Sequence, residues 1–216
     1  FSSDRTSFGV GIRVLPIPPF ASTYTVPITR GLWFQAPTRF SITAIQVPDE
    51  SNHGLQNVAV YRMANAPPAY SSSTSGGLEF VAIGQPSSSP LPCALSFDAG
   101  EYVGVLAACG DAASLRTSLA GMVAGTSGTV PSSILGQPLT LTQLVSQSNL
   151  VSSQGNAAYS SEVLGPVGRV QLAISSCVGI PYGSGSPSST AAAPALQTTA
   201  LPFLGSTAQL TVTNHD

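Results

Sequence analysis

Short runs rich in β-branched and aromatic residues recur along the chain, and helical periodicity hardly appears. Pro, Gly, Ser or Asn separate these runs, as expected of turns between strands. Apolar and polar residues alternate most clearly in 139–144, 170–174 and 209–213. The pattern predicts an all-β, antiparallel β-sandwich, jelly-roll-like, with a short C-terminal β tail. The predicted strands are 8–15, 32–35, 40–47, 57–63, 78–83, 101–108, 139–145, 168–174 and 207–213.

Three stretches between these runs are predicted to be long loops. They are 64–77, 84–92 and 110–134, and the last contains a further strand candidate at 117–124. Pro, Gly and Ser are frequent in these stretches, which favours turns over regular structure.

A change of composition near Cys177 divides the chain. We expect a β-sandwich domain over 1–176, which begins with an N-terminal strand and a Pro-rich spacer in 1–22. Gly, Ser and Pro dominate 177–194, as is typical of a linker. The remainder, 195–216, is predicted to form a C-terminal β-hairpin tail or a truncated module, because two strands alone are unstable in water.

Charge is unusually scarce. The chain has seven Arg, no Lys and nine acidic residues, so 7% of it is charged, against about 25% in an ordinary soluble domain. A formal charge of -2 without a basic run argues against nucleic-acid binding. No apolar stretch is long enough for a membrane-spanning helix. The chain begins at Phe1, as a processed secreted chain would.

The three cysteines support the prediction that the chain belongs to an oxidising compartment. Cys93 and Cys109 flank two strand-like runs joined by the turn 98–100, and a hairpin there would bring them to disulfide distance. We predict that they are bonded, and the alternative is two buried free thiols. Cys177 is then left to pair outside this sequence or to remain a buried thiol.

Catalytic chemistry has few candidates in this sequence. The two histidines are His53 and His215, no Gly-x-Ser-x-Gly elbow occurs, and no zinc spacing is present. We therefore predict a protein that is not an enzyme and needs no cofactor. The polar loop around His53 is interpreted as an ordinary solvated turn.

The same loop offers the one candidate ion site. Asp49, Glu50 and Asn52 supply hard oxygen atoms within four residues, which suits Ca²⁺, although the spacing is not that of an EF-hand. The alternative pair, Asp98 and Glu101, flanks a turn that these residues serve in their own right.

Aromatic residues offer a candidate surface for stacking sugar rings. Trp33, Tyr61 and Tyr70 are the candidates, with Phe34 and Tyr102 as further members. Trp33 and Phe34 are adjacent on a predicted strand, so they face opposite sides and at least one belongs to the core. The alternative for the exposed members is a protein interface, where aromatic residues are enriched and charges depleted.

Several motifs resemble those of one known kind of domain. They are Arg30-Gly31-Leu32-Trp33-Phe34-Gln35-Ala36-Pro37, residues 40–48, Gln56-Asn57-Val58-Ala59-Val60-Tyr61-Arg62, residues 97–106, residues 136–142 and Gly168-Arg169-Val170. Over roughly residues 25–175 the chain resembles a β-sandwich domain of PEP-CTERM-type extracellular bacterial proteins. Residues 182–185 and 204–212 are similar to a short β-module that often follows, although Ser186 stands where a Cys is expected. The resemblance implies an extracellular location and no known reaction.

These observations together predict an extracellular, cell-surface structural protein. We expect the subunit of a filament or layer, a homo-oligomer or homopolymer assembled through β-strand and apolar contacts. The alternative is a secreted carbohydrate-binding or adhesion module with a polysaccharide partner. The assembly strand would be one of the two ends, with the apolar residues Phe8, Val10, Ile12 and Val14, or Leu210 and Val212. The N-terminal segment is the better candidate, because the run Pro16-Ile17-Pro18-Pro19 predicts a stiff, extended spacer that discourages folding back. The alternative is that this segment is an ordinary first strand of the same sandwich.

Overall fold

The structure is a computed structural model that describes residues 12–120, 129–163 and 165–176. Within these residues the chain is all-β, and every ladder between its strands is antiparallel. The predicted fold class, an antiparallel β-sandwich, is confirmed. The strands are β1 (Arg13–Val14), β2 (Phe20–Thr25), β3 (Arg30–Gln35), β4 (Phe40–Gln46), β5 (Leu55–Met63), β6 (Leu78–Pro86), β7 (Leu91–Phe97), β8 (Tyr102–Cys109), β9 (Arg116–Ala120), β10 (Thr129–Ile134), β11 (Gln137–Ser146), β12 (Tyr159–Glu162) and β13 (Gln171–Ser175).

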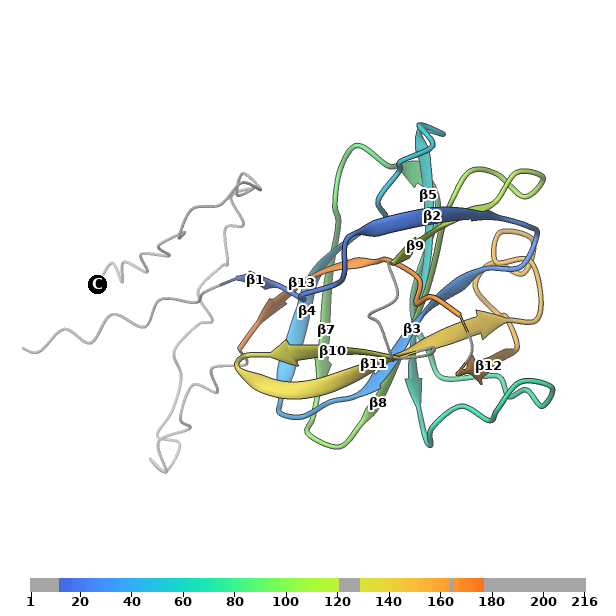
Figure 1. The fold of residues 1–216 in the computed structure, drawn as a ribbon. Coiled ribbons are helices and arrows are strands. Elements are labelled where there is room, and N and C mark those ends of the chain that lie inside the picture. Colours follow the sequence, from blue (N-terminus) through green and yellow to red (C-terminus); the bar gives the residue numbers. More distant parts are fainter. Residues whose placement is uncertain (1–11, 121–128, 164, 177–216) are drawn as a thin grey trace, which may run out of the picture.

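Two sheets form the layers of the sandwich (Figure 1). The four-stranded sheet has the order β1-β13-β4-β7. The nine-stranded sheet has the order β10-β11-β3-β8-β5-β6, with β12 beside β11 and β9 joining β2 to β8. The described part of the chain begins and ends on neighbouring strands, because β1 pairs with β13.

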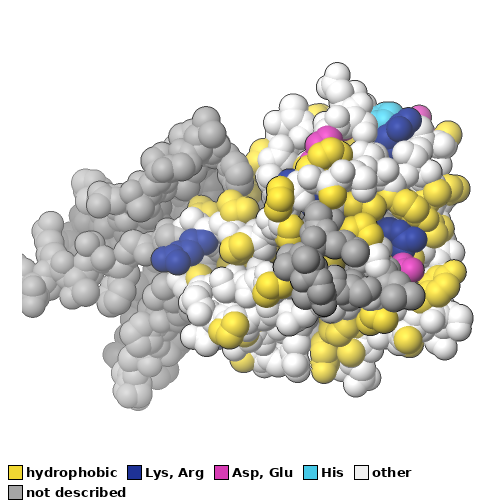
Figure 2. Space-filling model, viewed as in Figure 1, with side chains coloured by type: hydrophobic (Ala, Val, Ile, Leu, Met, Phe, Trp, Pro, Cys, Tyr) yellow, Lys and Arg dark blue, Asp and Glu magenta, His cyan; other side chains and the backbone are white. Residues whose placement is uncertain are grey.

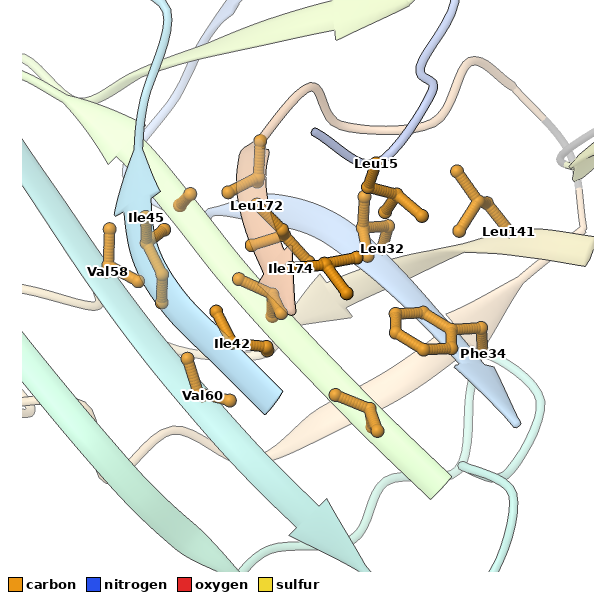
Figure 3. Packing of buried hydrophobic residues seen from close by; sticks show 14 of the residues in the cluster. Leu15, Leu32, Phe34, Ile42, Ile45, Val58, Val60, Leu141, Leu172 and Ile174 are labelled. Carbon is orange, nitrogen blue, oxygen red and sulfur yellow. The ribbon is translucent and has the colours of Figure 1, made fainter. Parts of the chain in front are cut away.

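The main core fills the space between the two sheets. Phe40 stacks on Phe97 with ring centroids 5.6 Å apart, and Phe34 lies 6.0 Å from Phe40. Burying an aliphatic or aromatic side chain of this size contributes roughly 1.5–3 kcal/mol. Figure 3 shows the aliphatic members pointing into the same space from both layers: Leu15, Leu32, Ile42, Ile45, Val58, Val60, Leu141, Leu172 and Ile174.

The larger sheet also buries its opposite face. Alternate residues of β5 divide between two cores, since Val58 and Val60 join the main core while Tyr61 and Met63 join a second cluster. Residues 147–158 and β12 cover that second face, and Leu150, Ala157 and Tyr159 pack onto it. The run from Val103 to Cys109 is buried throughout, which explains why β8 is apolar at nearly every position rather than alternating.

Two glycines allow three chain segments to meet at the centre of the fold. A Cβ on Gly31 would lie 1.8 Å from the Val105 carbonyl oxygen of β8. A Cβ on Gly168 would lie 2.6 Å from Gly31 Cα, and the Gly168 amide donates to the Gly31 carbonyl at 3.0 Å. Only glycine fits such a close backbone approach.

Most of the predicted strands are confirmed, with shifted ends. The candidate at 117–124 corresponds to β9, and the predicted loop 110–134 is wrong as a whole because it contains β9 and β10. The loop 84–92 is shorter than predicted, since β6 runs to Pro86 and β7 begins at Leu91. The predicted strand 207–213, Leu210, Val212, the linker 177–194 and the tail 195–216 lie outside the described residues, as do Phe8 and Val10.

The N-terminal spacer differs from its prediction. Pro16-Ile17-Pro18-Pro19 does not lead the chain away, because it lies against its own domain. The Pro16 carbonyl accepts from the Ser132 hydroxyl at 2.6 Å, and the Pro18 carbonyl accepts from Arg169 Nε at 3.2 Å. Ile17 packs on the main core and Leu15 is buried, so the segment up to Leu15 cannot be removed without opening that core.

Substitution of Gly31 tests the close approach. Gly31→Ala is expected to lower the free energy of unfolding by more than about 3 kcal/mol, because its Cβ would meet backbone that cannot move aside. Gly104→Ala is the matched control, since the nearest atoms to its Cβ would be side-chain atoms of Leu144 and Met63, at 3.1–3.3 Å. We expect that variant to cost about 1 kcal/mol. Denaturant unfolding measures both, and equal losses would contradict the account.

Candidate functional site

An open groove of about 320 Å³ lies at the end of β5, and it is the candidate site. Its lining comes from Arg62 and Met63 at the end of β5, from the following segments 64–68 and 74–77, and from Tyr159 at the start of β12. A volume of this size is at the lower end of what small-molecule sites occupy. Short hydroxyl and amide side chains, small apolar side chains and glycine backbone make up most of the lining.

Tyr159 holds one wall of the groove in place. Its backbone exchanges two hydrogen bonds with Thr74, at 2.8 and 3.0 Å, and its hydroxyl donates to the Gly76 carbonyl at 3.0 Å. The Arg62 amide donates to the Gly77 carbonyl at 2.7 Å. The wall 74–77 is therefore tied to two strands, so the groove has a fixed shape on that side.

Tyr61 supports the groove from beneath. Its ring lies 4.8 Å from that of Tyr159, and its hydroxyl donates to the Gly155 carbonyl at 2.6 Å. Burial raises the pKa of Tyr61 well above its ordinary value, and the neighbouring Tyr159 adds to this effect. Tyr61 is 1% exposed, so its predicted role as a sugar-stacking residue is wrong.

The other predicted aromatic residues are more accessible. Trp33 and Tyr102 are half-buried and pack on each other with ring centroids 6.2 Å apart. Trp33 Nε1 donates to Ser161 Oγ at 2.9 Å, and Tyr102 stands opposite Met63 across β5 and β8. Tyr70 is 60% exposed, in the loop that forms the groove, whereas Phe34 is fully buried. The structure thus brings Tyr102 beside the groove, with Trp33 next to it.

Among the described residues, Arg62 is the one charged side chain that lines the groove, and its charge is neutralised. Its Nε donates to Glu79 at 2.9 Å, its Nη1 pairs with Glu101, and its guanidinium lies 4.6 Å above the Phe97 ring. The Glu101 carboxylate also accepts from the Asp98 amide. That bond and the Arg62 pair lower the pKa of Glu101. The groove therefore presents little net charge to a ligand.

The candidate calcium residues have protein partners. Asp49 accepts from the His53 and Gly54 amides at 2.9 and 2.8 Å and from the Ser87 hydroxyl at 2.7 Å. Burial opposes ionisation of Asp49, but these hydrogen bonds outweigh it and lower its pKa. Glu50 pairs with Arg169. Asn52 lies at φ 52°, a turn conformation that Asn tolerates. The Asp49 carboxylate oxygens therefore serve to close the loop. The described residues contain no group of three or more His, Cys, Asp or Glu suited to a metal.

His53 and Asp111 belong to adjoining turns. Hydrogen bonds from the Ser114 hydroxyl and from the amides of Ala113 and Ser114 lower the pKa of Asp111, with a smaller contribution from His53. The Ser114 hydroxyl donates directly to Asp111 at 2.8 Å. In a Ser-His-Asp triad the serine would donate to the imidazole instead. These three residues therefore do not have the order of a triad, and His215 lies outside the described residues.

The predicted disulfide is wrong in this structure. Cys93 and Cys109 are free thiols. Cys93 lies on β7, which pairs with β4 in the smaller sheet, whereas Cys109 lies on β8 in the larger sheet. The turn after Phe97 carries the chain from one layer to the other, so the expected hairpin does not form. The Cys93 thiol approaches the Ile42 carbonyl and the Cys109 thiol the Pro48 carbonyl. Cys177 is outside the described residues.

The loop 64–77 was predicted correctly, but its function as a groove wall was not. The Gly76-Gly77 pair was the available signal, because both residues have positive φ and a Cβ on Gly77 would lie 2.0 Å from the Arg62 carbonyl oxygen. Tyr159 had no such signal. It lies in a short polar run that carries no strand pattern, and it reaches the groove only through long-range pairing.

Comparison of the chain with protein-family models, with curated proteins and with solved structures finds no significant match. Over the ranges that the structure describes, no helix is long and apolar enough to cross a membrane.

Thiol chemistry tests the corrected cysteine assignment. Burial raises the pKa of Cys93 to about 11 and that of Cys109 to about 12, the latter with help from Asp49. In a Cys177→Ser variant we expect two thiols that react slowly with a thiol reagent near pH 8 and rapidly once the protein is unfolded. An intact mass showing both sulfurs oxidised, with no thiol released on unfolding, would contradict the assignment.

The Asp49 loop predicts a loss of stability in acid. The pKa of Asp49 is lowered in the folded state, so its stabilising contribution is complete above its ordinary pKa of 3.8 and disappears as pH falls through the lower folded value. Asp49→Asn should lower the free energy of unfolding near pH 7 by roughly 1–3 kcal/mol and flatten its dependence on pH in acid.

The control is Asp98→Asn, which removes an ion pair to Arg39 whose side chains are both mostly exposed. We expect it to change stability by less than about 1 kcal/mol. Denaturant unfolding from neutral pH down to acid measures both variants. An unchanged pH profile in Asp49→Asn would show that this carboxylate does not stabilise the loop.

Proposed function

We propose that this chain is a non-catalytic, extracellular structural protein, the subunit of a surface filament or layer that assembles through β-strand edges and apolar contacts. The observation that carries the proposal is that β4, β7 and β13 of the four-stranded sheet contain no charged residue, and that the exposed apolar residues Ile12 and Val14 lie at the edge beside them. Charge depletion and apolar contact are features of protein interfaces.

The composition of that outer face supports the proposal. Strands β4, β7 and β13 contain no charged residue. Their core-facing side chains belong to the main core, so the alternate positions form the outer face. Cross-strand pairs at these positions consist of small or amide side chains: Gln171 with Gln46, Ala173 with Ala44, and Ser175 with Ser41 and Ser96. Ala173 and Ser175 of β13 are buried, at 2% and 7% exposed, whereas the β4 and β7 members are at least partly exposed. The accessible part of this face, on β4 and β7, therefore presents no charge to a partner.

The edge of the same sheet supports it further. Ile12 is 51% and Val14 52% exposed, and Val14 stands opposite Ala173 of β13. Strand β1 is the last strand of its sheet in the described chain, and edge strands offer backbone groups for pairing. A second chain could therefore add both a strand and apolar contact at this edge.

Few charges remain to keep copies apart. The seven acidic side chains in the described ranges all have partners. Glu50, Glu79, Asp98, Glu101 and Glu162 are in ion pairs with Arg, while Asp49 and Asp111 accept hydrogen bonds. Dark-blue and magenta atoms are correspondingly few on the face drawn in Figure 2. Little electrostatic repulsion then opposes self-association.

The extracellular location is part of this proposal. It rests on the scarcity of charge and on the resemblance to domains of PEP-CTERM-type proteins, because the disulfide expected to support it is absent. The apolar residues Phe8 and Val10, and Leu210 and Val212, remain candidates for the strand that one copy offers to the next.

Sedimentation velocity over a range of protein concentrations, followed by negative-stain electron microscopy, tests the proposal. The expected result is concentration-dependent growth of ordered polymers that persists at high salt, because the proposed contact depends on apolar side chains and backbone pairing, with the exposed Arg13 as the charge between Ile12 and Val14. The double variant Ile12→Asp/Val14→Asp should remain folded and monomeric. Deletion of residues 1–11, which keeps Leu15 in the core, should also give folded monomers if the N-terminal segment is the donor.

The matched control is Val163→Asp, which places a charge on an equally exposed apolar residue after β12. We expect this variant to assemble as the parent does. Monomers at every concentration, or polymers that the double variant leaves unchanged, would overturn the proposed interface.

A further inference from the structure

We propose that the groove at the end of β5 binds a neutral saccharide. This site is separate from the β1 edge, so it holds whether or not the protein assembles. Saccharides present hydroxyl groups around their rings and C–H groups on the ring faces. A suitable site combines uncharged hydrogen-bonding groups with an apolar or aromatic surface.

The chemistry of the lining favours an uncharged ligand. Arg62 is already paired with Glu79 and Glu101, so an anionic ligand would have to compete with two carboxylates for it. A cationic ligand finds no carboxylate among the lining residues that the structure describes. The exposed lining side chains include Asn65, Thr74 and Ser75, which offer an amide and two hydroxyls. These groups exchange hydrogen bonds with sugar hydroxyls without a charge to desolvate.

The glycine wall adds backbone to this polar lining. Gly76 has nothing within 4 Å of where its Cβ would lie, and it is exposed beside Gly77. A ligand can therefore approach the main chain closely at this wall. The hydrogen bonds from Tyr159 and Arg62 hold the wall in place. The wall therefore loses little conformational entropy when a ligand binds.

Apolar surface lies at the other side of the groove. Met63 lines it, and Tyr102 stands opposite Met63 across the ladder between β5 and β8. Trp33 packs against Tyr102, and both rings are half-buried. Met63 is only 5% exposed and Tyr102 lies next to the lining rather than in it. One sugar ring in the groove can therefore place its C–H face against the exposed lining residues Ala64 and Ala66 and its edge toward Tyr102, while its hydroxyls meet the loop. A longer chain can extend toward Trp33.

Titration of the ¹⁵N-labelled protein with neutral oligosaccharides tests the proposal. The probes are cellohexaose, chitohexaose, maltohexaose and a mannan oligosaccharide, with polygalacturonate as the charged comparison. The expected result is saturable shifts of amide signals in 64–68 and 74–77 and of the Trp33 indole N–H with at least one neutral probe. Polygalacturonate should bind more weakly than that probe.

Two variants connect such binding to the groove. Ser75→Trp fills the groove from an exposed position and should abolish the shifts. Its control, Ser72→Trp, places the same bulky residue in the same loop outside the lining and should bind as the parent does. Tyr102→Leu keeps an apolar side chain without the ring and should weaken binding roughly twofold to tenfold.

Three results would overturn the assignment. They are the absence of shifts with every neutral probe at millimolar concentration, tighter binding of polygalacturonate, and equal binding by Ser75→Trp and the parent. Groove signals that shift with protein concentration alone would assign the groove to contact between copies of the chain, and would likewise overturn the saccharide site.

Discussion

Burial of both faces of β5 and β8 is the constraint on which the rest of this structure depends. One face of these central strands is covered by the four-stranded sheet and the other by residues 147–158 and β12. The second cover brings Tyr159 against Tyr61 and fixes the wall of the groove. The groove is therefore a consequence of how the larger sheet is covered, and its wall 74–77 is tied by hydrogen bonds to two strands of that sheet.

The burial of strand faces also decides which strands could be predicted from the sequence. Strands that bury one or both faces, such as β4, β5, β8 and β11, carry a clear apolar pattern and were predicted to within a few residues. The strands missed by the prediction lie at edges. In β2 most residues are exposed, β10 contains Pro131 and pairs only with β11, and β12 has mostly polar residues. Edge strands need less apolar pattern and tolerate proline, so their sequences resemble loops.

Pairings between distant segments could not be predicted from local pattern. The turn after Phe97 looks like that of a hairpin, yet the two strands that it joins lie in different sheets, and this separates Cys93 from Cys109. Tyr61 has the composition of a stacking residue, but its position in the ladder with β8 points it into the second core. In both cases the partner strand, chosen by long-range pairing, decided the role of the residue.

The few charged residues have structural roles in this protein. Arg30, Arg62 and Arg169 each join segments that are distant in sequence through Glu162, Glu101 and Glu50. The few charges thus hold elements together, and β4, β7 and β13 of the smaller sheet are left uncharged. This division supports the proposed role of that sheet in assembly, while the neutral groove lies at a separate place and is available to a ligand.

Hydrogen exchange at low and at high protein concentration tests the proposed assembly most directly. Amides that become buried or paired on association exchange more slowly. The account predicts that protection gained at high concentration is concentrated at residues 12–15 and in β13 and β4, while 64–77 exchanges at an unchanged rate. Unchanged exchange at residues 12–15, or protection gained only in 64–77, would contradict it.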